Sequence, residues 1–315
     1  MESKYRGWQR ILLIIIPYIF IVGIFQVIGA LIAGVDLTTI HSTKTSEQNF
    51  ILAFFTLVGT FLLIWIFMKF IDKEKFINLG FDTKNRLNEF MIGIVIGAFI
   101  MTAGYSLLLF LGEINFQRTV FDFKEIIISF LIFVFVAIME EVLFRGYILK
   151  NLMNSFNKYI ALIVSSILFS LMHGFNPNID LFSLTNIFLA GIFLGISYIH
   201  TKNLWFPIAL HLSWNFFQTM FGFSVSGQKS YSLIEFNITD KNIMNGGDFG
   251  FEGSILSIVM MLVAIIGIEI YYRRQKPTTA PYIIYSEIGF STNPETFSKN
   301  IARVEKPPIF TSLKS

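Results

Sequence analysis

Long apolar stretches constrain the fold of this chain more than any other feature. A helix needs ~20 predominantly apolar residues to cross a bilayer, and eight stretches reach or approach that length. They are Gln9–Ala33, Phe50–Ile71, Phe90–Leu111, Glu125–Leu149, Tyr159–Phe175, Leu181–Ile199, Leu204–Phe221 and Ser254–Tyr272. The fifth and sixth are short for a full crossing. We predict an all-α fold, a polytopic membrane helix bundle of about eight transmembrane helices.

The composition supports a membrane protein and removes several kinds of site. Apolar residues make up 54% of the chain and charged residues 14%, whereas charged residues form about a quarter of a soluble domain. The chain has no cysteine, which excludes a disulfide framework, a thiolate nucleophile and a cysteine-ligated metal. The first apolar run is too long for a signal peptide and lacks a clear cleavage site, so we predict a retained span.

Basic residues are spread unevenly over the connections between the apolar stretches. Lysine and arginine in short loops mark the cytoplasmic side of a membrane protein. With eight crossings, the side that holds both termini carries thirteen of these residues and the other side five. The thirteen are Lys4, Arg6, Arg10, Lys73, Lys75, Lys84, Arg86, Lys150, Lys158, Lys202, Arg273, Arg274 and Lys276, and the five are Lys44, Arg118, Lys124, Lys229 and Lys241. Both termini are therefore predicted to be cytoplasmic.

The domain organisation follows from the same pattern. Residues 1–272 are predicted to form a single transmembrane domain. Residues 273–315 are polar and contain five prolines, so we predict a flexible cytoplasmic tail. The protein is expected to be a multi-pass integral membrane protein of the cell membrane. Nothing in the chain resembles a basic, aromatic surface for nucleic acid, so the bilayer is the expected environment and nucleic acid is not an expected partner.

Ionisable side chains lie inside three of the apolar stretches. Such residues are costly at bilayer depth and usually face the interior of the helix bundle. The first three stretches carry essentially none, and all of the unusual residues fall between residues 140 and 215. They are Glu140, Glu141 and Arg145 in the fourth stretch, His173 in the fifth, and His211, accompanied by Asn215, in the seventh.

Helical spacing suggests how these residues are arranged. Glu141 and Arg145 are four residues apart on one helix face, in the order that favours an ion pair. Glu140 is rotated by about 100° from Glu141 and can face another direction, which leaves it free for chemistry. His211 and Asn215 are also four apart and project together. A general base, imidazoles that handle a proton and an amide that donates to an oxyanion can thus converge from three helices.

Structural interpretations of the same residues stay open at this point. The Glu141–Arg145 pair alone is more often structural or part of a transport path, and a single buried histidine is more often a packing residue. Asn215 alone would join helices by a hydrogen bond. Asn186 either supports the site or makes such an interhelical bond. The three-helix set as a whole favours a site. No zincin helix, serine nucleophile motif or aspartate pair accompanies it.

At these residues the chain resembles the CPBP family of intramembrane proteases, also called the type II CAAX prenyl endopeptidase or ABI family. That family is marked by E-E-x-x-x-R, F-x-x-x-H and H-x-x-x-N/D on successive membrane helices. The corresponding residues here are Glu140-Glu141 with Arg145, Phe169 with His173, and His211 with Asn215. Each motif alone is weak, but three in order, each in an apolar stretch, are specific. The resemblance covers roughly residues 125–220.

The resemblance implies a role for each residue. Glu140 and His173 would activate the water that attacks a peptide carbonyl, while His211 and Asn215 would stabilise the oxyanion. Glu141 and Arg145, with Phe169, would hold the site. Members of the family have been described both as metalloproteases and as metal-independent glutamate proteases. No cofactor is certain here; if zinc is present, the candidate ligands are Glu140, His173 and His211.

The leading hypothesis is therefore an intramembrane endopeptidase whose water is activated by glutamate and histidine. The alternatives are a non-proteolytic adaptor or self-immunity protein on the same scaffold, and a proton-coupled transporter. A transporter usually has an inverted repeat, which the sequence lacks. The expected partner is a peptide or membrane-protein substrate that enters from the membrane or its cytoplasmic face. One geometric difficulty remains: Glu140 and His173 lie at different depths along their helices, so these helices must tilt, or the fifth must begin deeper, for the two to meet.

Overall fold

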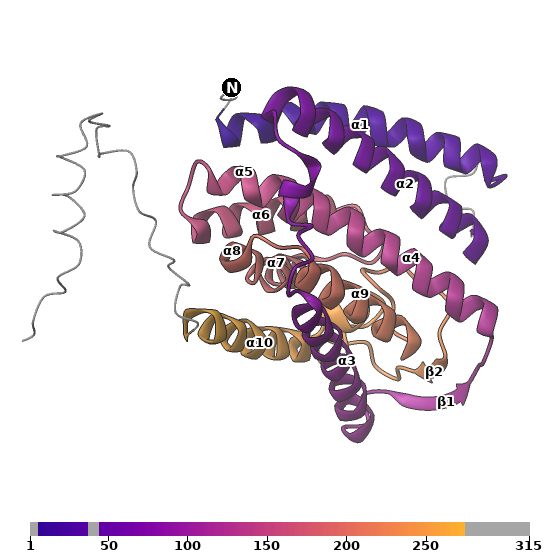
Figure 1. The fold of residues 1–315 in the computed structure, drawn as a ribbon. Coiled ribbons are helices and arrows are strands. Elements are labelled where there is room, and N and C mark those ends of the chain that lie inside the picture. The colour runs from indigo at the N-terminus through magenta and orange to yellow at the C-terminus, as the bar shows by residue number, and fades with distance from the viewer. Residues whose placement is uncertain (1–5, 37–43, 275–315) are drawn as a thin grey trace, which may run out of the picture. The chain divides into compact units, whose positions relative to one another are not determined.

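The computed structural model describes residues 6–36 and 44–274 of the 315-residue chain, and over these residues it is the predicted all-α membrane bundle (Figure 1). The α-helices are α1 (Gly7–Ile32), α2 (Ser46–Ile66), α3 (Leu87–Phe110), α4 (Phe123–Glu141), α5 (Lys150–Met153), α6 (Lys158–Met172), α7 (Leu181–Gly195), α8 (Tyr198–Thr201), α9 (Trp205–Met220) and α10 (Ile255–Arg274). The remaining elements are strands β1 (Asn115–Thr119) and β2 (Ile234–Asn237), π-helical segments Phe67–Asp72 and Val142–Leu149, and 3₁₀ turns Phe76–Leu79 and Phe251–Gly253.

All eight predicted apolar stretches are helical. Within the described residues, six continuous helical segments are long and apolar enough to cross a membrane. These are Gly7–Ile32, Ser46–Asp72, Leu87–Phe110, Phe123–Met153, Leu181–Thr201 and Ile255–Arg274. The other two helices are shorter, with 15 residues in α6 and 16 in α9. Both lie among the longer helices, where a short helix can still contribute side chains at bilayer depth (Figure 1).

Glycines allow α3 to cross close to α9. A Cβ atom at Gly93 would lie 2.8 Å from the Phe206 carbonyl oxygen, and one at Gly97 would lie 2.8 Å from Ser213 Cβ. Small residues four apart let helix backbones approach in a membrane, where apolar burial alone gives little drive to associate. The Ser213 hydroxyl also donates to the Ile94 carbonyl at 2.6 Å. These contacts fix α9, which carries His211 and Asn215.

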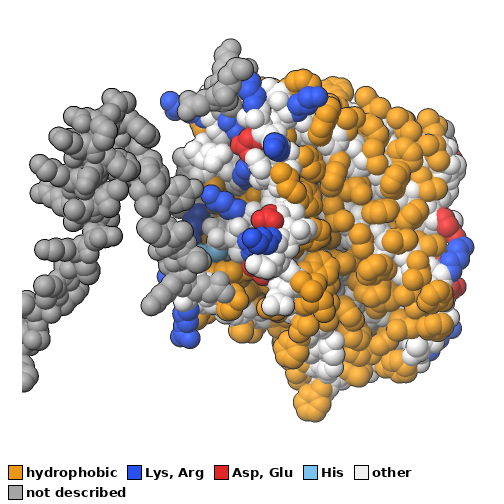
Figure 2. All heavy atoms as spheres, viewed as in Figure 1, with side chains coloured by type: hydrophobic (Ala, Val, Ile, Leu, Met, Phe, Trp, Pro, Cys, Tyr) orange, Lys and Arg blue, Asp and Glu red, His pale blue; other side chains and the backbone are white. Residues whose placement is uncertain are grey.

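The outer surface of the bundle is strongly apolar. Figure 2 shows hydrophobic side chains covering the flank of the molecule, with charged side chains gathered toward its two ends. Ile16, Phe20 and Phe99 are among the exposed large apolar side chains, with exposed fractions of 65%, 65% and 70%. A soluble monomer rarely exposes an apolar surface this continuous. The surface therefore matches a protein surrounded by lipid.

A small β-sheet lies where the sequence predicts only polar connections. Strands β1 and β2 pair antiparallel, with Asn115 opposite Asn237 and Thr119 opposite Ile234. Arg118 and Glu235 form an ion pair across the strands at 2.7 Å. The strands join the connection before α4 to the connection after α9. This sheet gives the loops at one end of the bundle a defined structure.

The predicted tail falls almost wholly outside the described residues. Helix α10 continues to Arg274, two residues beyond the predicted domain boundary at residue 272. Residues 275–315 are not among those described, so the flexible cytoplasmic tail stays a prediction.

Candidate active site

Glu141 is the centre of a buried polar cluster. Its side chain is fully buried at the end of α4, directly before the π-helical segment Val142–Leu149. One carboxylate oxygen, Oε1, accepts a hydrogen bond from Arg145 Nη1 at 2.9 Å and another from His211 Nδ1 at 2.8 Å. The predicted Glu141–Arg145 pair is therefore present, and it includes His211 as a third member. π-Helical segments are rare and frequently occur at functional sites.

Arg145 makes buried contacts with residues of α4, α6 and α7. Its guanidinium donates from Nη2 to the Gly191 carbonyl on α7 at 3.0 Å and lies 4.6 Å from the centre of the Phe169 ring on α6. Its side chain is 2% exposed. A buried charge costs several kcal/mol unless it is paired and hydrogen-bonded, and Glu141 supplies that partner. The cluster thus ties α4, α6, α7 and α9 together around one ion pair.

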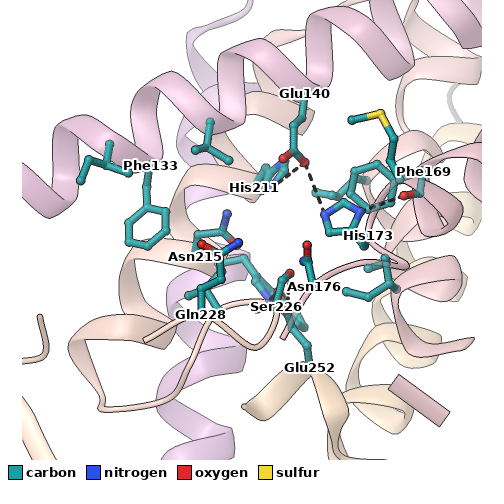
Figure 3. Close-up of a pocket in the computed structure, with 18 of the residues that line it drawn as sticks. Phe133, Glu140, Phe169, His173, Asn176, His211, Asn215, Ser226, Gln228 and Glu252 are labelled. Atoms are coloured by element: carbon teal, nitrogen blue, oxygen red, sulfur yellow. Dashed lines mark hydrogen bonds and ion pairs between the residues drawn. The ribbon is translucent and has the colours of Figure 1, made fainter. Parts of the chain in front are cut away.

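Glu140, unlike Glu141, lines the cavity, and its side chain points toward two imidazoles (Figure 3). Glu140 Oε2 lies 4.0 Å from His173 Nε2 and 3.9 Å from His211 Nε2. This oxygen is buried and has no hydrogen-bond partner among the described residues. Although Glu140 and His173 lie at different distances along their helices, the structure brings them together.

The second ring nitrogen of each histidine has its own partner. His173, which caps the C-terminal end of α6, is hydrogen-bonded through Nδ1 to the Phe169 carbonyl at 2.8 Å. His211 uses Nδ1 to contact Glu141. A carbonyl can only accept, and a carboxylate normally accepts as well, so we assign the proton to Nδ1 in both rings. Both Nε2 atoms are then directed toward Glu140.

These groups line a cavity of about 380 Å³. One side is apolar and belongs to α2 and α4, with Ala53, Ile132, Phe133 and Val136. The opposite side carries amides, including Asn215 on α9 (Figure 3). Asn215 is 4% exposed and lies one helical turn from His211, as predicted from their spacing. The cavity contains a carboxylate, two imidazoles and amide donors beside an apolar wall.

A second carboxylate lines the cavity and was missed by the sequence reasoning. Glu252, from the 3₁₀ turn before α10, accepts hydrogen bonds from Trp214 Nε1 at 3.1 Å and from the Ser226 backbone N–H and hydroxyl at 2.8 and 2.9 Å. Ser226 adopts a φ of 48°, a conformation that non-glycine residues rarely hold without support. A glycine in this connection is the sequence feature that indicates its close packing. A Cβ atom at Gly250 would lie 1.9 Å from the Ser224 carbonyl oxygen.

Asn186 does not line the cavity. Its amide nitrogen donates to the carbonyl oxygens of Glu252 and Ser254 at 2.8 and 3.1 Å. It therefore joins α7 to the start of α10, the interhelical interpretation of this residue, and holds the backbone that carries Glu252. Phe169 contacts the cluster directly, since its ring centre lies 4.7 Å from that of His173.

The candidate zinc ligands do not fit the metal as they stand. Ligand atoms ~2.1 Å from a tetrahedral zinc lie about 3.4 Å from one another. The distances from Glu140 Oε2 to the two Nε2 atoms, 4.0 and 3.9 Å, are about half an ångström too long. Within residues 6–36 and 44–274, no three His, Asp or Glu side chains form a group with metal-binding geometry.

Comparison with known protein families agrees with the three motifs. Residues 122–217 match the family model described as Type II CAAX prenyl endopeptidase Rce1-like. The matched range begins at the N-cap of α4 and ends within α9, so it contains the three helices that carry the motifs. No curated protein and no solved structure matches the chain. The family match confirms the predicted resemblance.

Proposed function

We propose, from the premise that this chain belongs to the CPBP family through its Rce1-like domain, that it is an intramembrane endopeptidase that hydrolyses peptide bonds with a water activated by Glu140. The observation that carries the proposal is the convergence of Glu140 Oε2 on two histidine Nε2 atoms, at 4.0 and 3.9 Å, inside a cavity. The helices around the site belong to an integral membrane protein, and we expect that membrane to be the cell membrane.

The space between Glu140 and His173 suits one water molecule. Two acceptors 4.0 Å apart can each receive a hydrogen bond of about 2.8 Å from the same water. With the proton of His173 on Nδ1, its Nε2 accepts one water hydrogen and Glu140 Oε2 accepts the other. The oxygen lone pair then faces the cavity, where a substrate carbonyl would lie. Such positioning of a reacting group lowers the barrier by fixing geometry before the chemical step.

In the proposed reaction, the water oxygen bonds to the peptide carbonyl carbon and its proton passes to Glu140. The carbonyl oxygen becomes an oxyanion. Asn215 donates to it from its amide, and His211 donates from Nε2 when the ring carries both protons, a form that the adjacent Glu141 carboxylate stabilises. Glu140 then gives its proton to the leaving nitrogen as the C–N bond breaks. A carboxylic acid and an amine result, and Glu140 returns to its starting state.

The deciding experiment compares Glu140→Gln with the parent protein. Purified protein in liposomes is incubated with a peptide library, and products are identified by mass spectrometry. A general acid–base group contributes about 10²–10⁴-fold to rate, so the cleavage rate of Glu140→Gln should be lower than that of the parent by at least about 10²-fold. Glu125→Gln, on the same helix but outside the cavity lining, is the matched control and should cleave like the parent. Equal rates for Glu140→Gln and the parent would refute the assignment.

A chelator arm tests whether the reaction needs a metal. The ligand distances favour a metal-free water, so full activity is expected after dialysis against chelator. Loss of activity that returns on adding zinc would overturn the metal-free mechanism while leaving the peptidase assignment in place.

A further inference from the structure

The two ends of the helix bundle differ in what they carry. Helices α1, α3, α6 and α9 finish at the end where β1 and β2 lie, which we call the loop end (Figure 1). Helices α2, α4, α7 and α10 finish at the opposite end, which also holds the start of α1 and which we call the basic end. The end of the bundle that supplies the lining residues is therefore the end toward which the cavity extends.

The cavity lining reaches the loop end. Asn49 lies in the first turn of α2, and Asn176 follows the C-terminal end of α6. Gln228, Lys229 and Ser230 come from the connection after α9, and all three are exposed. From α4 the lining takes residues between Ile132 and Glu140, so the cavity extends from Glu140 back toward the start of that helix. No lining residue among those described comes from a connection at the basic end.

The charge asymmetry orients these ends in the membrane. Among the described residues in the connections and at the helix ends, the loop end carries five lysine and arginine residues: Lys44, Arg118, Lys124, Lys229 and Lys241. The basic end carries Arg6, Arg10, Lys69, Lys73, Lys75, Lys84, Arg86, Lys150, Lys158, Lys202, Arg273 and Arg274. Basic residues in short loops remain on the cytoplasmic side. The loop end therefore faces away from the cytoplasm.

We propose that the cavity opens to the extracytoplasmic side of the membrane, so that Glu140 acts on extracytoplasmic peptide segments. The choice of substrate rests on the proposed function, whereas the direction of opening does not. This differs from entry at the cytoplasmic face, which the sequence suggested. A prenylated C-terminus in the cytoplasm would have to cross the bundle from the basic end, where the described lining offers no entrance.

The walls of the cavity suit an extended peptide that is apolar on one side. Ile132, Phe133 and Val136 offer contacts to apolar side chains, while Asn176 and Gln228 offer donors and acceptors to the substrate backbone. An extended segment presents side chains alternately on two faces. A segment at the membrane surface, with one apolar face, matches this division.

The absence of cysteine from the chain makes the opening directly testable, because any introduced cysteine is the only one present. Gln228→Cys places a thiol at the rim of the cavity, and Lys75→Cys places one at the basic end. Each is treated with a membrane-impermeant maleimide in right-side-out and in inverted vesicles. We expect Gln228→Cys to react in right-side-out vesicles and Lys75→Cys in inverted ones. If Gln228→Cys fails to react in right-side-out vesicles, or reacts from the same side as Lys75→Cys, the proposal is wrong.

A second experiment tests the side on which the cavity opens separately from catalysis by Glu140. The labelling pattern should be identical when Gln228→Cys is combined with Glu140→Gln, because orientation does not depend on activity. In the catalytically intact background, a bulky label on Gln228→Cys should block peptide cleavage, and a label on Lys75→Cys should not. Unchanged cleavage after complete labelling at Gln228→Cys would refute substrate entry past this residue, even if the orientation proved correct.

Discussion

The shared carboxylate of Glu141 allows a quantitative test of the buried cluster. Glu141→Gln keeps the size of the side chain and an acceptor oxygen for the Nδ1–H of His211, but it removes the carboxylate that forms the ion pair with Arg145. Both side chains are 2% exposed or less, so solvent does not screen the loss. Removing one partner of a buried ion pair typically costs about 3–5 kcal/mol. We expect the free energy of unfolding of Glu141→Gln to fall by that amount.

The double variant Glu141→Gln with Arg145→Met isolates the cause. It removes both charges and retains side chains of similar size, and such replacements are often neutral for stability. The double variant should therefore recover most of the stability lost by Glu141→Gln alone. Peptide cleavage should not recover, because the negative charge that stabilises doubly protonated His211 is still missing.

Unfolding curves in mixed detergent micelles, followed by tryptophan fluorescence, measure the stability of each variant. Glu125→Gln serves as the control for a neutralised glutamate on α4. If the double variant is no more stable than Glu141→Gln, the unpaired arginine is not the source of the loss. If cleavage returns together with stability, the charge of Glu141 has no part in the reaction.

Three further predictions concern the cavity rim, the helix crossing and a helix cap. Glu252→Gln weakens the hydrogen bonds from Ser226, so the free energy of unfolding should fall by ~1–3 kcal/mol. KM should rise with little change in kcat, and an equal fall in kcat and kcat/KM would contradict this prediction. Gly97→Leu should lower the free energy of unfolding by ~1–3 kcal/mol or more, measured by thermal unfolding, because the larger side chain overpacks against α9. Gly267→Leu should be as stable as the parent, because no atom lies within 4 Å of a Cβ added there. The backbone N–H of Ser183 lowers the pKa of Asp180, so the stability that this cap adds is present above the ordinary aspartate pKa of about 3.9 and is lost as pH falls through its lower folded value. The stability difference between the parent and Asp180→Ala should shrink in acid, and growth of that difference on acidification would count against the cap.

The sequence was sufficient for the helices and for the residues of the motifs. Crossing a bilayer requires long apolar helices, so hydrophobic length located all eight of them. Ionisable side chains are costly in such helices, and this cost made Glu140, His173 and His211 conspicuous. The order of the motifs predicted a resemblance to this family, and the match of residues 122–217 to an Rce1-like family model supports that resemblance. The chemical roles of these residues remain predictions.

The sheet, the π-helical segments and the position of Glu252 depend on contacts between distant parts of the chain, which the sequence pattern does not show. β1 and β2 are separated by more than a hundred residues. β1 has no apolar alternation, and β2 alternates over only four residues, Ile234 to Asn237. A π-helical segment has the same composition as the α-helix around it. Glu252 lies in a connection that is polar in composition, and only its contacts with Trp214 and Ser226 bring it to the cavity.

The connection between α9 and α10 supplies a large part of the cavity rim. Val225, Ser226, Gln228, Lys229, Ser230 and Glu252 all come from this one continuous stretch of chain. The proposed reacting groups come instead from α4, α6 and α9. If the proposed function is correct, the residues that select a peptide and those that cleave its bond are thus encoded in separable parts of the gene. Because loops accept sequence change more readily than packed helices, exchanging this stretch would redirect the proposed peptidase to new peptides while its proposed chemistry stayed the same.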